Sequence, residues 1–359
     1  MPESCLQIDL DSGPVTGLDL RDVLEVQVEE SVEAADAVSL VARVQARPDG
    51  GWTSVLDPLT EPETPVSLGV SFQDVSYRFD GLSAEARWHL DAAGGSRLTV
   101  KALDRTLELD REEKVVAWPG SSDSAIAEAI LSQAHGLQTE IEPTPAGPDP
   151  DVHVTIQRGT DLAFLHALAE KWGYFFYLEA DEVGVTGHFH SLDPVGAPQA
   201  ELALGYGLDA PAVDARVELA AGKRVRAARI PPLGDAAQTA DSAGVDEAQG
   251  AHTLGGVATE LLSPVAVDGE VDPAAVAQGI ARRSAFGASL ELEFDTQRVG
   301  VMLRARRPVL VRGLGTSLSG RYLVWRVRHT VTGDRHRQAV TLMRNALGLT
   351  GDEPFGRLP

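Results

Sequence analysis

The feature that most constrains the fold is a helix that leads directly into a strand at residues 159–178. Thr160 or Asp161 can cap the free amides of the first helical turn. Gly173 stands where a left-handed residue would end the helix, and aromatic, strand-like residues follow at once. Apolar residues recur at intervals of three and four, which predicts one buried face: Leu162, Leu165, Leu168, Ala169 and Trp172. We therefore expect a rigid unit whose role is packing.

The first hundred residues have the alternation typical of β-strands. Apolar and polar residues alternate strictly at 24–29, and residues 38–44 nearly repeat the pattern. Further strand-like runs occur at 66–72, 84–90 and 98–102. Short strands separated by turns favour an antiparallel barrel or sandwich.

The middle of the chain has a different pattern. Ser122 or Ser124 can cap a helix that Gly136 would end, and its apolar face would include Ile126 and Ile130. A proline-rich connector and a short strand at 152–156 lead into the helix at residue 160. The order helix, strand, helix, strand predicts a small α+β unit between two β-rich regions.

The remaining sequence is again mostly strand-like. Residues 231–256 form a long, acidic segment of small residues without periodicity, which predicts a loop. Asp272 and Pro273 predict the start of a helix at 273–285. The expected strands are 202–204, 213–219, 225–230, 290–294, 301–305, 309–312, 322–331 and 338–343.

Composition argues against several classes of function. The single cysteine, Cys5, excludes an internal disulfide and a zinc site built from cysteines. The net charge of −22 argues against specific or general nucleic-acid binding, because phosphate neutralisation needs clustered Lys and Arg. The N-terminal region contains no long apolar run, so we expect no signal peptide, no membrane segment and synthesis in the cytoplasm.

Few residues suggest chemistry. His188 and His190 would project from one face of a strand, but no third metal ligand can be identified near them in sequence. The glycine-rich run 313–320 lacks the Gly-Lys-Ser/Thr ending of a phosphate loop and leads into a strand, which favours a plain turn. His166 lies in the packing helix and is expected to be structural. We therefore predict no catalytic residue, no cofactor and no metal.

Three stretches together resemble the late control D proteins of contractile phage tails and the hub half of VgrG-type spike proteins. The first is 98–105 with the helix at 121–136, and the second is 160–177, with its Asp, Phe-Leu, Leu-Ala, Gly-Tyr and Phe-Tyr elements. The third is 319–329, which contains Ser-Gly-x-Tyr-x-Val and a later His, with the Arg344-Asn345 ending. Their order and spacing cover the chain from about residue 20 to 347.

The resemblance implies a mainly β fold with an α+β insert, in which two tail-tube-like antiparallel β-barrels are joined through the helix–strand–helix–strand unit. It also implies a homotrimer ring that adapts a sixfold tail tube to a threefold spike in the baseplate of a phage tail or injection particle. The expected partners are the tail tube protein and baseplate wedge proteins. Since the chain ends soon after Asn345, a separate spike protein is expected as well.

These expectations divide the chain into three domains. Residues 1–118 would form the first β-barrel, completed by strands from about 200–230, and residues 119–200 the α+β unit. Residues 201–359 would form the second β-barrel, with the acidic loop 231–256 and the helix 273–285.

Charge is distributed unevenly along the sequence. Residues 281–345 contain thirteen Arg and four acidic residues, a net of +9, which leaves −31 on the rest of the chain. Such asymmetry suggests surfaces with different partners, and we single out Arg304, Arg306 and Arg307 as candidates to face an acidic neighbour. The alternative is that the arginines pair singly with carboxylates of the same chain.

Two other function classes remain open at this stage. A ligand- or carbohydrate-binding β protein would need exposed aromatic residues. Half of the ten Trp and Tyr residues stand in core-like patterns: Trp172, Tyr174, Tyr177, Tyr322 and Trp325. A cell-wall hydrolase is less well supported, since it would need an acid pair or a metal site that the sequence does not reveal.

Overall fold

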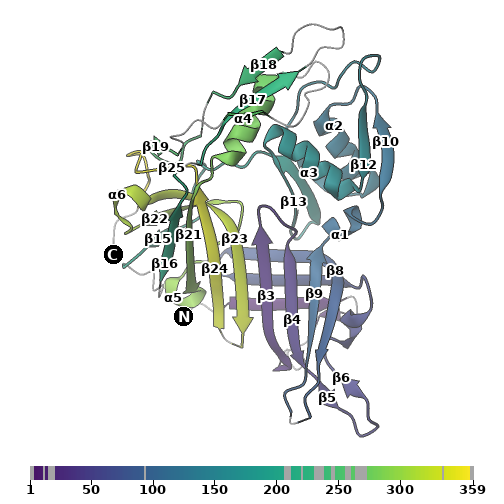
Figure 1. Cartoon of the computed structure of the whole chain (residues 1–359). Coiled ribbons are helices and arrows are strands. Elements are labelled where there is room, and N and C mark those ends of the chain that lie inside the picture. Colours follow the sequence, from purple (N-terminus) through teal and green to yellow (C-terminus); the bar gives the residue numbers. More distant parts are fainter. Residues whose placement is uncertain are drawn as a thin grey trace.

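The computed structural model describes a chain built mainly on one large mixed sheet (Figure 1). The sheet has the strand order β11-β14-β13-β8-β9-β4-β3-β23-β24-β21-β16, with β1, β2, β7, β15 and β22 attached beside this path. The structure describes residues 4–10, 13–14, 21–92, 94–205, 212–219, 221–229, 238–243, 247–254, 260–262, 273–333 and 335–355.

The N-terminal strands form an antiparallel region with its own core. Alternate residues point inward, so that Val26, Leu40, Leu68, Phe79 and Val100 are all almost completely buried. The elements are β1 (Ser4–Leu10), β2 (Gly13–Pro14), β3 (Val23–Ser31), β4 (Ala37–Arg43), β5 (Gln45–Ala46), β6 (Trp52–Thr53), the short helix η2 (Asp57–Thr60), β7 (Pro65–Phe72), β8 (Val75–His89) and β9 (Arg97–Asp104).

The C-terminal strands form a second region with a separate core. This core includes Leu290, Val309, Tyr322, Val327 and Leu342. The elements are β15 (Glu201–Ala203), β16 (Val213–Val217), β21 (Ala288–Asp295), α5 (Thr296–Val299), β22 (Pro308–Arg312), α6 (Gly315–Leu318), β23 (Gly320–Thr332), β24 (Arg335–Arg344) and β25 (Ala346–Leu347).

The two β regions are continuous with each other. Strand β3 pairs with β23 in antiparallel register from Val26–Val331 to Ser31–Arg326. Among the described residues, the strand pairing forms an open path from β11 to β16 and does not close into a barrel. The backbone hydrogen bonds between β3 and β23 therefore hold the N-terminal and C-terminal regions in one sheet.

The α+β unit covers one end of this sheet (Figure 1). Its core contains the apolar faces of its helices, which include Ile126, Ile130, Leu165 and Trp172, together with Phe176 from β13. The elements are α1 (Thr106–Leu109), β10 (Lys114–Trp118), α2 (Asp123–Glu128), the π-helical turn η3 (Ala129–Ala134), β11 (Gln138–Ile141), β12 (Thr155–Gly159), α3 (Asp161–Trp172), β13 (Phe175–Ala180) and β14 (Val185–His190).

The helix–strand unit forms as its sequence predicts. The Thr160 hydroxyl caps α3 by accepting from the Ala163 amide at 3.2 Å, and Gly173 ends the helix with a φ of 69°. The predicted buried face is confirmed for Leu165, Leu168, Ala169 and Trp172, which share one core with Ile126 and Ile130, whereas Leu162 is only partly buried. Local capping and periodicity were sufficient here because each signal lies within the helix itself.

A second helix from late in the sequence completes this core. Helix α4 (Pro273–Ser284) packs on α3 and lies beside a small sheet of β17 (Arg224–Arg229), β18 (Gln238–Asp241) and β20 (Glu260–Leu262). The backbones touch at Gly173 and Gly279, where a Cβ on either glycine would lie 2.1 Å from a carbonyl oxygen of the other helix. The helix at 273–285 is confirmed. However, it packs in the α+β unit and not with the second β region.

Two other expectations differ from the structure. Strands β15 and β16 pair with β22 and β21, so strands from about 200–230 do not complete the first β region. Residues 301–305 are irregular rather than a strand. Short antiparallel and parallel pairings are decided by neighbours far away in sequence, which apolar alternation alone cannot identify.

The acidic segment 231–256 is only partly a loop. Of its residues, 231–237, 244–246 and 255–256 lie outside the described residues; the others include β18 and β19 (His252–Thr253). Gln249 is buried and exchanges two hydrogen bonds with Asn345, and Arg344 donates to the Gln249 carbonyl at 2.9 Å. The Arg344-Asn345 ending therefore fixes this part of the segment.

Within the described residues, none of the helices has the length and apolar content needed to cross a membrane.

Candidate functional site

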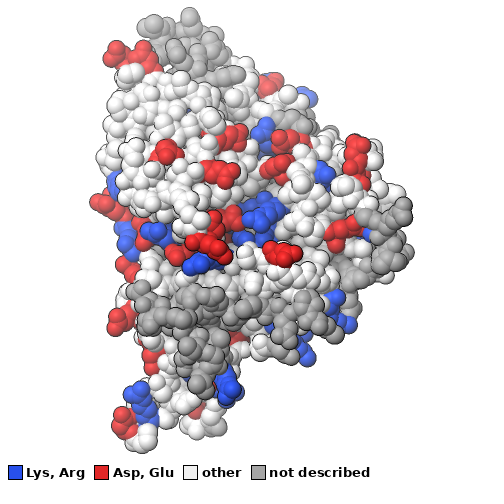
Figure 2. All heavy atoms as spheres, turned by 180° about the vertical axis from the view of Figure 1, so that it is seen from behind, with Lys and Arg blue, Asp and Glu red and all other residues white. Residues whose placement is uncertain are grey.

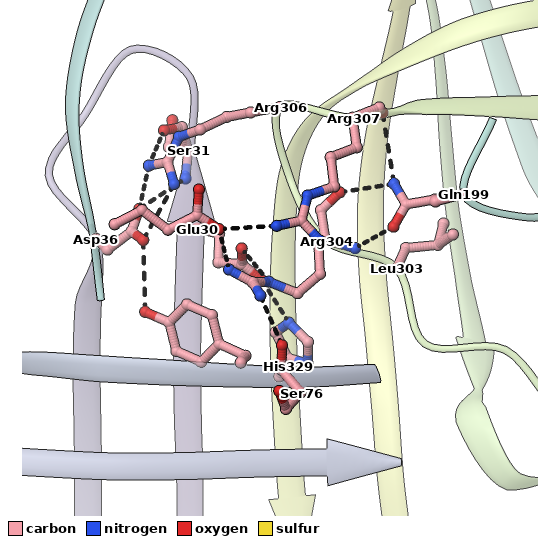
Figure 3. A network of polar contacts seen from close by, with 12 residues as sticks. Glu30, Ser31, Asp36, Ser76, Gln199, Leu303, Arg304, Arg306, Arg307 and His329 are labelled. Atoms are coloured by element: carbon pink, nitrogen blue, oxygen red, sulfur yellow. Dashed lines mark hydrogen bonds and ion pairs between the residues drawn. The ribbon is translucent and has the colours of Figure 1, made fainter. Parts of the chain in front are cut away.

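The most unusual part of the molecule is the irregular segment 301–307, which lies where the two β regions and the α+β unit meet. Two glutamine side chains replace the missing strand partners. Gln338 accepts from the Leu303 amide at 2.8 Å and donates to its carbonyl at 2.7 Å. Gln199 does the same for the backbone of Arg304, at 2.9 Å in each direction (Figure 3). The backbones of Leu303 and Arg304 are thus hydrogen-bonded without a neighbouring strand, while the side chains of Arg304 and Arg306 are buried.

Arg304 connects all three parts of the chain. Its guanidinium donates to the Glu30 carboxylate on β3 at 2.8 Å, to the Ser76 carbonyl on β8 at 2.6 Å and to the Glu179 carboxylate on β13 at 2.8 Å. It also lies 4.7 Å from the centre of the Tyr77 ring. Only 4% of the residue is exposed. The planar guanidinium has five N–H donors in a fixed geometry, so this one side chain can reach acceptors on three separate strands.

Arg306 forms a second buried connection. It adopts a left-handed backbone with a φ of 67°, which turns its side chain toward the loop between β3 and β4. There it donates to the Asp36 carboxylate at 2.5 Å and to the Ser31 carbonyl at 2.7 Å. The guanidinium stacks 4.3 Å from the centre of the Tyr177 ring on β13. We call Glu30, Asp36, Glu179, Arg304, Arg306 and His329 the ionic junction.

Two neighbouring histidines extend the ionic junction into the sheet. His329 contacts the Glu30 carboxylate through Nε2 at 3.0 Å and His336 through Nδ1 at 3.0 Å. Burial alone would raise the pKa of Glu30, but the charge of Arg304 and the hydrogen bond from His329 lower that pKa to about 2. Burial and the neighbouring His329 lower the pKa of His336 to about 3. The ionised Glu30 carboxylate is therefore linked through His329 to a neutral His336.

The three arginines singled out from the sequence have different positions. Arg304 and Arg306 are buried and paired within the chain, so neither forms part of an exposed interaction surface in this structure. Arg307 lies at the edge, with 48% of its side chain exposed and one contact to Glu179 at 3.0 Å. If these arginines all faced a partner protein, reversing the three to Glu would leave the chain folded. In this structure the reversal should unfold the chain, because the buried Glu30 and Asp36 would then each face another negative charge.

The other arginines of the segment 281–345 favour the alternative of pairing within the chain. Arg326 and Arg328 both contact Glu29, and Arg337 contacts Glu293. Figure 2 shows acidic and basic side chains interspersed on one face of the molecule, without separation into two fields. Sequence counts missed this arrangement because they cannot show which carboxylates lie opposite each arginine.

Beside the ionic junction, the structure adds a third group to the histidine pair. His188 and His190 lie on one face of β14, as expected, and Glu140 lies opposite His188 on the neighbouring parallel strand β11. One ligand atom from each of these residues lies within 4.8 Å of the other two. Burial lowers the pKa of His188 to about 4 despite the nearby carboxylate of Glu179, so its imidazole is neutral. Glu140 precedes His188 by 48 positions, so no pattern in the sequence pointed to this contact.

The remaining candidates are structural. Residues 313–320 contain the short helix α6 and lead into β23, as expected of a connection between strands. His166 packs edge-on against Phe176, with ring centres 5.4 Å apart. The aromatic residues with core-like patterns are all at least 92% buried: Trp172, Tyr174, Tyr177, Tyr322 and Trp325. Trp52 and Trp88 are about half exposed.

The fold is similar to that of solved tail proteins. A tail protein from Neisseria meningitidis MC58 has a TM-score of 0.63 and 12% identity, covering 96% of this chain and 97% of that chain. The 43 kDa tail protein of prophage MuSo2 from Shewanella oneidensis has a TM-score of 0.62 and 14% identity, covering 96% of this chain and 99% of that chain.

A third similar structure comes from a secretion system. It is an E. coli protein described as a type VI secretion component with structural similarity to the T4 tail proteins gp27 and gp5. Its TM-score is 0.55 with 14% identity, covering 94% of this chain and 76% of that chain. No protein-family model matches the sequence, and a search of curated proteins found no match. The chain therefore has a mainly β fold shared with phage tail proteins and a type VI secretion component.

Proposed function

We propose that this protein is a structural hub in the baseplate of a contractile phage tail or related injection device. The observation that carries the proposal is the similarity along the whole chain to two tail proteins, which covers 96% of this chain in each case. The resemblance of residues 98–105 and 121–136, 160–177, and 319–329 with 342–345 to late control D and VgrG-type hubs supports the same role from the sequence.

In this proposal three copies form a ring around one axis. Each copy has two β regions with separate cores, and the proposal gives each region the role of one tail-tube-like unit. Three chains then supply six β units, which match a sixfold tail tube on one side and seat a threefold spike on the other. The tail tube protein, a separate spike protein and wedge proteins are the proposed partners.

The rigid connection between the β regions supports this role. The β3–β23 pairing joins them through backbone hydrogen bonds, and the ionic junction fixes both against the α+β unit. A ring that adapts two symmetries needs its two β units at a constant angle, and a continuous sheet provides that. The proposed units are about residues 1–118, residues 119–200 with β17, β18, β20 and α4 added, and the remaining C-terminal strands.

Electron cryo-microscopy of particles assembled from this protein and the products of the adjacent genes would test the proposal. We expect three copies around one axis with a buried area of roughly 2,000 Å² or more per contact. Six copies in the ring, or one copy bound at the periphery, would contradict it. The mass of the complex in solution separates the alternatives, because a ligand-binding protein or hydrolase would remain independent of these partners.

A further inference from the structure

Glu140, His188 and His190 have the composition and placement of a metal site. We propose that they bind one zinc ion, with Glu140 Oε, His188 Nδ1 and His190 Nε2 as ligands. These atoms lie close together already, with His188 Nδ1 3.3 Å from Glu140 Oε2 and 3.4 Å from His190 Nε2. Two imidazoles and a carboxylate are ligands that Zn²⁺ prefers.

The sheet fixes the direction of all three side chains. His188 and His190 are two residues apart on β14 and therefore point to the same face. The parallel pairing of β11 with β14 places Glu140 opposite His188. On the other side of β14, Tyr177 of β13 pairs with His188 and stacks on its ring, with centres 4.6 Å apart. The ligands are thus held by strands and not by loops, which favours a preformed site.

One hydrogen bond and one nearby carboxylate outside the ligand set favour the required orientation of the histidines. His190 Nδ1 lies 2.6 Å from the Ser191 carbonyl, to which it must donate, so the lone pair of Nε2 faces the site. His188 Nε2 lies 3.9 Å from the Glu179 carboxylate, which favours a proton on Nε2 when Nδ1 binds a metal. A ligating histidine whose other nitrogen donates to a carbonyl or carboxylate is the usual arrangement around zinc.

Without a metal, two acceptors of the site lie beside the same nitrogen of His188. Glu140 Oε2 and His190 Nε2 both lie within reach of the single proton that His188 Nδ1 can carry. The Tyr177 hydroxyl also lies 3.2 Å from His190 Nε2 and supplies a hydrogen bond there. A divalent cation would satisfy the carboxylate and both nitrogens at once.

The site borders a polar hollow of about 530 Å³ that is also lined by Asp74, Thr186 and Glu182. This opening provides an entry path and leaves a coordination position free, as is common where zinc has three protein ligands. Arg304 and Arg307 reach the same hollow, but both are paired with the Glu179 carboxylate. Zinc here would fasten the edge strand β11 to β14, next to the ionic junction.

The test is calorimetric titration of the full-length, untagged chain with ZnCl₂ after treatment with a chelator. We expect one equivalent of zinc per chain and a higher melting temperature of the zinc-loaded protein. Glu140→Gln should weaken binding by about tenfold or more, and His190→Gln should abolish the binding step. The side chain of Glu140 is 69% exposed, so the E140Q variant keeps the fold.

Glu182→Gln is the matched control, because it removes the same charge from the rim of the same hollow without removing a ligand. The proposal requires that E182Q binds zinc as the unchanged protein does. It is overturned if the chain binds no zinc, or if E140Q and E182Q weaken binding equally. Either result would leave the proposed hub function intact, since the ring does not depend on the metal.

Discussion

The core around α3 and the ionic junction are both buried, but they are stabilised in opposite ways. In the α3 core, apolar side chains from short stretches of sequence pack on one another, with Leu165 and Leu168 facing Ile126 and Ile130. In the junction, Arg304 and Arg306 pair with carboxylates that lie up to 274 positions away. An apolar contact tolerates an imperfect neighbour, whereas a buried charge requires its partner. The junction therefore specifies how the units fit together, and the α3 core mainly supplies stability within one unit.

The largest effect should come from Arg304→Ala. It leaves Glu30 buried without its main counter-charge, so we expect a loss of about 3–5 kcal/mol in the free energy of unfolding, measured by urea denaturation. Arg337→Ala is the control. That side chain is 53% exposed and pairs with Glu293, so its loss should cost no more than about 0.5 kcal/mol. Similar costs for both variants would show that the junction is no different from a surface ion pair.

Leu168→Ala tests the other side of the comparison. The side chain is 95% buried against the α3 core, so the cavity should cost about 2–5 kcal/mol. Leu162→Ala serves as the control, because Leu162 lies on the same helix and is only partly buried. The same denaturation experiment should give a clearly smaller cost for Leu162→Ala. Equal costs would mean that the helix has no single buried face.

Acid should destabilise the protein through the buried His336, which contacts His329 of the ionic junction. The folded pKa of His336, about 3, lies below the ordinary value of 6.5, so its contribution to stability is complete above pH 6.5 and is lost as the pH falls toward 3. Between pH 7 and pH 5 this loss should be on the order of 1–2 kcal/mol. Thermal melts of His336→Gln across this range should show a smaller pH dependence than the unchanged protein. An unchanged slope would exclude His336 as the source.

Thr160→Ala removes the cap of α3 and should cost about 1 kcal/mol. Thr160→Ser retains the hydroxyl that accepts from the Ala163 amide, so it should recover most of the loss. Denaturation of both variants beside the unchanged protein measures the difference. If Ser does not rescue stability, the hydroxyl is not the stabilising group.

Arg307→Ala should have the smallest effect on stability, about 0–1 kcal/mol, because half of the side chain is in solvent. Of the three arginines selected from the sequence, Arg307 is the one whose charge a partner protein could reach. Assembly assays should therefore be compared with urea denaturation of the same variant. Normal folding with impaired incorporation into particles would assign Arg307 to an interface. Normal incorporation would exclude it as an interface residue.

The sequence predicted the elements whose signals are local. The helix α3, its cap at Thr160, its end at Gly173 and the strand β13 all followed from residues within one short stretch. The alternating strands β3, β4, β23 and β24 followed for the same reason. The strand expected at 301–305 was wrong because two glutamine side chains take the place of a neighbouring strand there.

The sequence by itself determined the mainly β class, the α+β insert and the periodic faces that form its cores, because these depend on the spacing of side chains along one backbone. Only the tertiary structure decided that Arg304 and Arg306 are buried, that Glu140 joins His188 and His190, and that α4 packs on α3. Each of these depends on strand register or on contacts between distant segments. Such contacts form only when the chain folds, so the partner of a residue cannot be read from the residues around it in the sequence.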